Sequence, residues 1–437
     1  MIAARIPPMP GACPRLLATA LLGGIGAAAM TAPPRIAWAQ SADQTQLRQQ
    51  IDELKRQLAA QQKLIDAMQQ QMEQLQAKQA AEAETKTMAA SPTPAPAEPV
   101  VTSSSPRMQV ALSGQVDRLL NLADDGKSTK AYFVDNNVSV SRLRLAANAQ
   151  ISEDLSAGTN MELAISPNNS ADVSQVNEDG SQKDEFRKVE ALLQSKSWGD
   201  VFFGKGDPAT KDIARMDLSN TDVLAYASTG DPAGGLLFRT SDGEDLTSTN
   251  INSVFTDFDQ GRTNRIRYDT PKLQGAYASA SYGADQKWGV AGRWAGAGHG
   301  IRAAAGIGVQ DPSKTGVDVV YAGSASVLHD ATGLSLTYGT AWQKQDAGTG
   351  ELQYVKAGWQ RNFFKFGKTA FSLDFGYDKD APGDGDKGRT IGFVALQSFA
   401  NYGTDLFAGF RSYDFDDGDG PGTSTIYVAT AGTRVKF

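Results

Sequence analysis

The sequence of 437 residues contains one cysteine and two histidines, and both shortages limit its chemistry. The cysteine, Cys13, precedes an apolar N-terminal stretch, so the chain beyond that stretch carries neither a thiol nor a disulfide. The histidines, His299 and His329, are isolated, which leaves little for a metal site or a histidine-dependent hydrolase. A Gly-x-Ser-x-Gly elbow and a phosphate-binding glycine loop are also absent. These shortages indicate a protein that is not an enzyme and that uses neither a metal nor another cofactor.

Acidic residues are absent from residues 1–39, which include three arginines. An apolar stretch covers 16–30, and Ala37-Trp38-Ala39 has the small-x-small pattern of a cleavage site. This arrangement predicts a secretory signal peptide at 1–39, with an uncleaved anchor as the alternative. Its removal takes away three positive charges, so the formal net charge changes from -7 to -10. That acidity argues against nucleic acid as a partner.

Residues 40–82 are rich in Gln, Leu and charged side chains and contain neither glycine nor proline. Apolar residues recur there every 3.5 positions, and Ile51, Leu58 and Ile65 occupy one seam position. This period predicts a left-handed coiled coil, which requires partner chains and therefore favours an oligomer; a solitary solvated helix is the alternative. Residues 83–106 are rich in Pro, Ser and Ala and are expected to form an extended linker.

Beyond the signal no stretch reaches the roughly 18 consecutive apolar residues of a membrane-spanning helix. Residues 107–437 instead alternate between apolar and polar side chains in about sixteen segments of roughly ten residues, the length of a tilted membrane strand. The last segment ends with Val435 and Phe437 on one face and Arg434 and Lys436 on the other. A soluble sandwich also alternates, but Tyr and Trp residues near the segment ends resemble the aromatic girdles of a membrane barrel. The predicted fold is an all-β, about 16-stranded antiparallel transmembrane barrel with an N-terminal α-helical coiled coil.

About fifty residues separate Gly206 from the next clear segment, which is unusually long for a connection in a compact domain. Its sparse apolar residues would let it pack inside the barrel, where sixteen strands enclose a bore that side chains alone do not fill. We therefore expect a constriction loop at 207–250. Its acidic residues are Asp207, Asp212, Asp217 and Asp222.

Alternation also predicts which charged residues face the lumen. A basic wall opposite the acidic loop would create a transverse field and a preference for anions. The alternative for any single arginine is a structural ion pair with a loop carboxylate. Acidic runs at 383–386 and 414–419 fall in predicted loops and are expected to be hydrated, with calcium binding as the alternative. The predicted pore-lining residues are Arg142, Arg144, Lys205, Arg265, Arg267, Arg302, Arg411, Arg434, Glu162 and Asp117.

Three motifs resemble those of general bacterial outer-membrane porins. Gly204-Lys-Gly-Asp207 resembles the strand end that introduces the constriction loop, and 262–271 resembles the strand after it, with Thr270 in place of the usual serine. Thr404–Arg411 together with the terminal Phe437 is similar to the last two porin strands. A coiled coil and a proline-rich spacer ahead of the barrel most resemble the DcaP-like trimeric porins.

The resemblance implies a homotrimer in the bacterial outer membrane, with the coiled coil in the periplasm. It implies passive passage of small polar or anionic solutes such as dicarboxylates, and contact with outer-membrane lipid and lipopolysaccharide. The coiled coil is a candidate contact with peptidoglycan. One alternative function is a structural envelope protein, in which the barrel is an anchor and the coiled coil a periplasmic tether. The other alternative, a barrel hydrolase, is disfavoured by the shortage of histidine.

Overall fold

The computed structural model describes residues 100–105, 108–180, 183–314, 316–346, 348–418, 420 and 422–437. The predicted signal peptide, the predicted coiled coil and most of the predicted linker lie outside these residues. Within the described residues, no helix is both long enough and apolar enough to cross a membrane.

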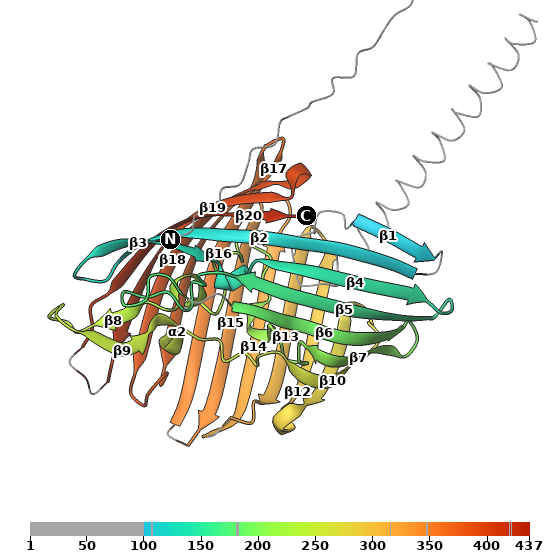
Figure 1. Ribbon diagram of the computed structural model, residues 1–437, viewed down its shortest axis with the longest axis horizontal. Helices are drawn as coiled ribbons and strands as arrows, with labels where there is room; N and C mark the ends of the chain where they lie inside the picture. Colours follow the sequence, from blue (N-terminus) through green and yellow to red (C-terminus); the bar gives the residue numbers. More distant parts are fainter. Residues whose placement is uncertain are drawn as a thin grey trace, which may run out of the picture. The chain divides into compact units, whose positions relative to one another are not determined.

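The described chain forms a closed antiparallel β-barrel of 16 strands (Figure 1), which confirms the predicted fold class for this part of the chain. Its strands are β2 (Met108–Asp124), β4 (Arg142–Gln150), β5 (Leu155–Ser166), β6 (Lys183–Ser195), β7 (Gly199–Gly206), β10 (Thr263–Asp269), β11 (Ala276–Gly283), β12 (Trp288–Gly298), β13 (Ile301–Asp311), β14 (Val317–His329), β15 (Leu334–Gln345), β16 (Gly348–Phe364), β17 (Gly367–Lys379), β18 (Lys387–Phe399), β19 (Thr404–Asp416) and β20 (Ile426–Lys436). Successive strands pair around the ring, β7 pairs with β10, and β20 pairs with β2 to close the barrel.

Two further strands, β1 (Val100–Ser105) and β3 (Thr129–Asp135), also pair with β2. β3 and β4 share one edge of β2, so together they act as a single barrel strand interrupted by the 3-10 turn η1 (Asn137–Ser139). β1 pairs with the start of β2, where β20 has already ended. The end of the predicted linker thus pairs with a part of the β2 edge that β20 leaves free.

The two faces of the barrel wall have opposite polarity. On β17, Leu373 and Phe375 are exposed on the outside, at 57% and 40%, whereas Ser372 and Asp374 are buried inside. A soluble β-sandwich has the reverse arrangement, with apolar side chains inside. An apolar outer face and a polar interior suit a barrel that is surrounded by lipid.

The connections differ in length at the two ends of the barrel. Turns such as 151–154, 196–198 and 330–333 are short, and we call this the short-turn end. The 3-10 turn η5 (Ala400–Tyr402) also lies there, whereas η4 (Ala284–Gln286) lies at the other end. The long connections 167–182 and 207–262 leave from that other end, the long-loop end.

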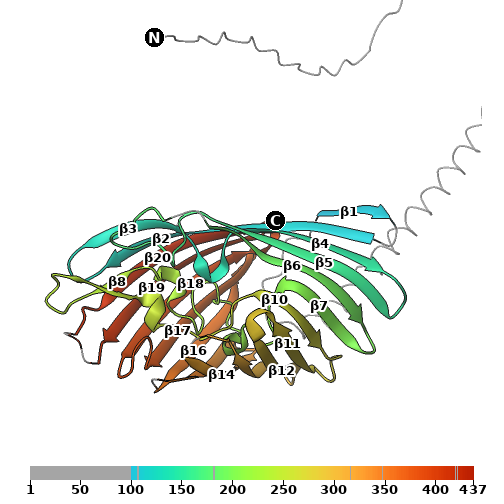
Figure 2. The same cartoon turned by 60° about the horizontal axis from the view of Figure 1, so that its bottom comes forward.

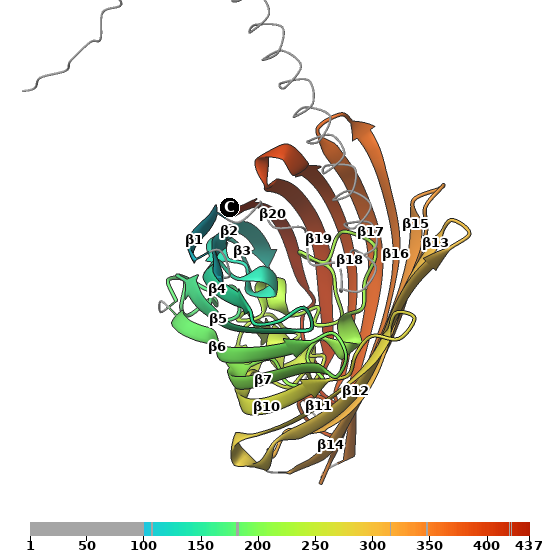
Figure 3. The ribbon, with the colours of Figure 1, turned by 90° about the vertical axis from the view of Figure 1, so that its right-hand side faces the viewer.

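The segment 207–262, which we call the long loop, lies inside the barrel between the green strands and the orange to red strands (Figure 3). It contains η2 (Ile213–Arg215), η3 (Asp231–Ala233), β8 (Leu237–Arg239), β9 (Leu246–Asn250) and the short helix α2 (Ile251–Val254). β8 leads into a hairpin that lies beside the strands β3 and β18–β20 (Figure 2). Thr240, just after β8, forms an isolated β-bridge with Thr423 in the loop between β19 and β20.

An apolar core fills the part of the lumen next to β18, β19, β20 and β2. Residues of the long loop bury their side chains there against inward-facing residues of these strands. Strict alternation would predict a polar inner face throughout. Here the inner face is apolar, because it packs against apolar side chains of the loop. The core includes Val223, Leu224, Phe238, Ile251, Val254 and Phe255 of the loop and Leu119, Val394, Leu396, Phe407, Tyr413, Phe415, Ile426 and Val428 of the strands.

The chain terminus completes the seam between the first and last barrel strands. The Gly114 backbone N–H donates to the Phe437 carbonyl at 2.7 Å, and the Phe437 N–H donates to the Gly114 carbonyl at 3.0 Å. The Phe437 ring covers Gly114, where an added Cβ would lie 2.7 Å from the ring. The terminal aromatic residue therefore belongs to the closure of the barrel.

Deletion of Phe437 should lower the yield of assembled barrel severalfold, because it removes both hydrogen bonds and the ring at the closing seam. Heat-modifiable mobility on gels measures the assembled fraction. Barrels that do assemble should conduct like the unaltered protein, since Phe437 is not among the residues that line either cavity described below. A normal yield after deletion would contradict this role.

Candidate functional site

Hydrogen bonds attach the long loop to inward-facing side chains of the wall. The Met216 N–H donates to Ser324 Oγ at 2.9 Å, and the Leu218 N–H donates to Ser326 Oγ at 3.0 Å. On another strand of the wall, β19, the Tyr413 hydroxyl donates to the Thr229 carbonyl at 2.9 Å. The loop thus crosses the lumen while its backbone groups are satisfied by the barrel.

A buried ion pair also holds the loop. Lys356 of β16 has no exposed side-chain surface and donates through Nζ to Asp217 Oδ2 at 2.8 Å and to the Ala225 carbonyl at 2.7 Å. Asp217 accepts further hydrogen bonds from Ser219 and Thr337. Because a buried charge is tolerated only when it is paired and hydrogen-bonded, this contact fixes the loop at one place on the wall.

Between the loop and the wall formed by β2, β4, β5, β6 and β20 lies a cavity of about 650 Å³, which we call the loop cavity. The strands supply six basic residues and one acidic residue to its lining, and the long loop supplies seven acidic and three basic residues. The strand residues are Arg142, Arg144, Arg187, Lys188, Arg434, Lys436 and Glu162. The loop residues are Asp207, Asp212, Asp217, Asp222, Asp231, Asp257, Asp259, Lys211, Arg215 and Arg262. A basic wall therefore faces an acidic loop.

Most of these charges have a partner. Arg187 Nε lies 2.6 Å from Glu162, Arg434 Nη2 lies 2.9 Å from Asp405, and Lys436 Nζ lies 2.9 Å from the same carboxylate. On the loop, the Arg215 guanidinium pairs with Asp257 at 2.5 Å and with Asp212 at 3.4 Å. Paired groups shape the cavity, but they contribute little net charge to it.

Arg144 differs from these paired groups. Its Nε donates to Asn160 Oδ1 at 2.8 Å, and among the described residues no carboxylate oxygen lies within ion-pair distance of it. Arg144 is also exposed. On the loop side, Asp222 has no ion pair within the described chain, and Asp231 accepts a hydrogen bond from Asn137 at 2.7 Å. The uncompensated charge thus lies at Arg144 on the wall and at these two loop carboxylates.

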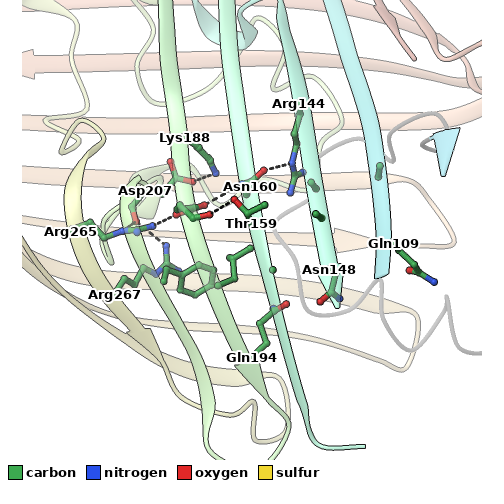
Figure 4. A pocket seen from close by; sticks show the side chains of 17 residues that line it. Gln109, Arg144, Asn148, Thr159, Asn160, Lys188, Gln194, Asp207, Arg265 and Arg267 are labelled. Carbon is green, nitrogen blue, oxygen red and sulfur yellow. Dashed lines mark hydrogen bonds and ion pairs between the residues drawn. The ribbon is translucent and has the colours of Figure 1, made fainter. Parts of the chain in front are cut away.

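A second cavity of about 450 Å³, the strand cavity, continues along β2, β4, β5, β6, β7 and β10 (Figure 4). Arg144, Lys188 and Asp207 line both cavities, so the two are adjacent. Figure 4 shows Gln109 and Asn148 farther along the strands from these shared residues. The two cavities together follow the wall formed by β4, β5, β6, β7 and β10, whereas the apolar core lies against β18, β19, β20 and β2.

Arg265 and Arg267 line the strand cavity but are compensated. Arg265 Nη2 donates to Glu190 Oε2 at 2.5 Å, and Arg267 donates to both carboxylate oxygens of Asp269 at 2.7 Å. Both guanidinium groups also lie over the Phe202 ring. Gly206 leaves room for the Arg265–Glu190 pair, because a Cβ there would lie 2.2 Å from Glu190 Oε2. The second glycine of the Gly-Lys-Gly-Asp motif, Gly206, is therefore explained by the close approach of the Glu190 carboxylate.

The structure brings most of the predicted pore residues to the cavities. Arg142, Arg144, Glu162, Arg434 and the four loop aspartates line the loop cavity, and Arg265 and Arg267 line the strand cavity.

Four predicted residues lie elsewhere. Lys205 pairs in register with Val189 and Asn264, which are exposed on the outer face, and its amine contacts Glu185. Arg302 faces inward but lies at the short-turn end, paired with Asp330 at 2.7 Å. Lys205 shares a strand face with Phe203, which is 68% exposed, and the register of β7 is regular through Gly204, so alternation counted from Phe203 places Lys205 outside and the lumenal assignment was wrong.

The other two, Arg411 and Asp117, point inward but are covered. Arg411 makes two hydrogen bonds to Asp374 at 2.6 and 2.9 Å, and both side chains are buried. Asp117 is fully buried and accepts a hydrogen bond from Asn136. These two are structural, because neither lines a cavity in the described barrel.

Sequence reasoning missed several cavity residues. Arg187 and Lys188 are adjacent, yet both line the loop cavity, because the register between β5 and β6 shifts at this point. Strict alternation assigns two neighbours to opposite faces and so could not place both. Lys211 and Arg215 lie in the loop, where no periodic signal exists.

Burial changes the protonation of the loop carboxylates. Burial raises the pKa of Asp231 to about 6, against the opposing charge of Arg215, and nearby Asp257 raises it further. Burial likewise raises the pKa of Asp222, with Arg434 opposing. Burial would also raise the pKa of Asp207, but the positive charges of Lys188 and Arg262 outweigh it, so that pKa lies below its usual range. The loop is therefore less negative near pH 6 than its composition implies.

Within the described part of the chain, no group of three or more His, Cys, Asp or Glu side chains is arranged to hold a metal ion. The site consists of charged and polar side chains around open space.

A closed barrel with an apolar outside, an inward-folded loop and charged cavities along one wall defines an outer-membrane channel protein. Comparison with known families agrees, because the family model described as Gram-negative porin matches residues 85–418. The chain belongs to the Gram-negative porin family, and it is a channel of the outer membrane rather than an enzyme.

Solved structures show the same fold at low sequence identity. OmpT, an outer membrane protein of Vibrio cholerae, is 13% identical, covers 78% of this chain and 100% of its own, and has a TM-score of 0.50. An anion-selective porin from Comamonas acidovorans is 15% identical, covers 76% of this chain and 100% of its own, and also has a TM-score of 0.50. A comparison with curated protein sequences gave no match.

Replacement of Lys356 by methionine should destabilise the barrel by about 3–5 kcal/mol, because Asp217 stays buried without its partner. Denaturant unfolding in detergent measures the loss. Single-channel conductance should rise, since the loop is released from the wall. The double variant Lys356→Met/Asp217→Asn removes both charges and should recover much of the stability. Equal stability of the single variant and the unaltered protein would contradict the anchoring role.

Lowering the pH from 7.5 to 5 should make the channel more anion-selective. Asp231 has a raised pKa of about 6, so it is mostly ionised at pH 7.5 and mostly neutral at pH 5. The cavity then loses negative charge while the arginines stay positive. The reversal potential in a salt gradient measures the change. At pH 7.5 the Asp231→Asn variant should already show part of the anion selectivity that the unaltered protein gains at pH 5. An equal reversal potential of the unaltered protein at the two pH values would argue against this assignment.

Proposed function

We propose that the protein is a passive diffusion channel for small hydrophilic solutes with a preference for anions, including dicarboxylates. The observation that carries the proposal is Arg144, a wall cation without a carboxylate partner at the junction of the two cavities. A solute that moves along the wall meets this charge in both cavities.

The transverse arrangement of charge supports selectivity. The basic side chains of β4 and β6 face the acidic residues of the long loop across the loop cavity. Such a field orients dipolar solutes. Where a charged side chain has no partner in the protein, the field also favours ions of the opposite sign. The long loop is the proposed constriction, because its apolar core fills one side of the lumen and leaves the charged side open.

The proposed assembly is a homotrimer with its short-turn end and N-terminal coiled coil in the periplasm. The coiled-coil period of 40–82 supports an oligomer, and a trimer form of Vibrio cholerae OmpT shares the fold. Lipopolysaccharide at the long-loop end and peptidoglycan near the coiled coil are proposed contacts of this arrangement.

A structural anchor without transport is the competing function. Purified protein in planar bilayers distinguishes the two, because a channel gives stepwise current and an anchor gives none. Addition of a dicarboxylate such as succinate should reduce the current of chloride salts, if the two anions share the path along Arg144.

Replacement of Arg144 by glutamine should shift the reversal potential in a salt gradient towards cation selectivity, and Arg142→Gln/Arg144→Gln/Arg267→Gln should shift it further. Lys205→Gln is the matched control, because it removes the same charge from the outer face. Equal shifts for Arg144→Gln and Lys205→Gln, or no shift for the triple variant, would refute the proposed path.

A further inference from the structure

The hairpin that joins β16 and β17 carries a cluster of exposed rings away from both cavities. Phe364 and Phe366 stack with centroids 5.0 Å apart, and Phe366 stacks on Phe399 at 4.7 Å. The hairpin extends at the short-turn end, beside the turn between β18 and β19 (Figure 3). The ring stack thus lies at one margin of the barrel wall.

A second row of rings runs from the hairpin along the outer face. Phe363 meets Trp359 at 5.3 Å, edge to face, and Trp359 stacks on Phe371 at 6.1 Å. Phe371 continues to Phe393 at 6.4 Å. We call the whole surface the hairpin patch; it consists of Trp359, Arg361, Phe363, Phe364, Lys365, Phe366, Phe371, Phe393 and Phe399.

The hairpin patch is also positively charged. Arg361 and Lys365 are exposed, and the described part of the chain shows neither an ion pair nor a hydrogen bond for either side chain. No acidic residue occurs between Arg361 and Leu373. Two cations next to exposed rings are therefore available to an outside partner.

The other turns at this end differ in charge. The turn 151–154 contains Glu153 and Asp154, and the turn 330–333 contains Asp330. Lys196 and Lys272 are single cations in their turns. In the described barrel, the hairpin patch combines two free cations with stacked rings on a surface that a membrane barrel exposes to lipid.

We propose that the hairpin patch binds an anionic phospholipid of the membrane leaflet at the short-turn end. The lipid phosphate lies between Arg361 and Lys365, and an acyl chain lies along Trp359, Phe371 and Phe393. Aromatic side chains favour the level of the headgroups, and each Lys or Arg near an anionic lipid surface contributes about 1 kcal/mol. The planar guanidinium of Arg361 matches two phosphate oxygens. This lipid site is separate from solute passage, because none of its residues lines a cavity.

The test compares lipid retention by the full barrel and by Arg361→Gln/Lys365→Gln. Protein in nanodiscs of equal phosphatidylglycerol and phosphatidylcholine is released into the gas phase, and native mass spectrometry counts the bound lipids. Two cations at about 1 kcal/mol each correspond to roughly 30-fold weaker binding of phosphatidylglycerol in the variant. Lys196→Gln/Lys272→Gln removes the same charge at the same end and should retain phosphatidylglycerol normally.

Three outcomes would overturn the proposal. One is equal retention of phosphatidylglycerol by the variant and the unaltered protein, and another is equal retention of both lipids by the unaltered protein. The third is loss of oligomer in the variant with unchanged lipid binding, which would assign the patch to a second copy of the chain. Single-channel conductance of the variant should be unchanged, which shows that its barrel is folded and keeps the test independent of the proposed selectivity.

Discussion

Closure of the sheet is the constraint on which the rest of the structure depends. In lipid no water is available to an unpaired backbone N–H or C=O, so a spanning sheet must satisfy every strand edge within the protein. The pairing of β20 with β2 removes the last free edge. The hydrogen bonds between Gly114 and Phe437 continue this pairing to Phe437. Once the ring is closed, each strand presents apolar side chains to lipid, and its inner face is polar except where the long loop packs an apolar core against β18, β19, β20 and β2.

The long loop converts a wide bore into a one-sided path. Its apolar residues pack against β18, β19 and β20, and Lys356 of the nearby strand β16 holds Asp217. The remaining space follows the wall of β4, β5 and β6, where basic strands face an acidic loop. The same segment thus contributes to the stability of the barrel and to the selectivity that we propose, because its buried half fixes the position of its charged half.

Several features of this arrangement could be predicted from alternation alone. The number of strands, the inward direction of Arg142 and Arg144, and the acidic loop follow from a period of two and from one unusually long connection. Lys205 was misplaced although it shares a strand face with the exposed Phe203, whereas Arg187 was missed because a register shift brings it inward beside Lys188. Local breaks in a strand leave no periodic signal, since alternation assumes an unbroken pleat.

The sequence by itself determined the fold class, the two faces of most strands and the place of the loop in the chain, because side chains of a strand point alternately to its two sides. Only the tertiary structure decided which lumenal charges are free. Arg411 and Arg144 have the same sequence signature, yet Asp374 neutralises the first and no carboxylate reaches the second. Pairing depends on which residues the closed ring and the folded loop bring together across the lumen, and those partners are far apart in the chain.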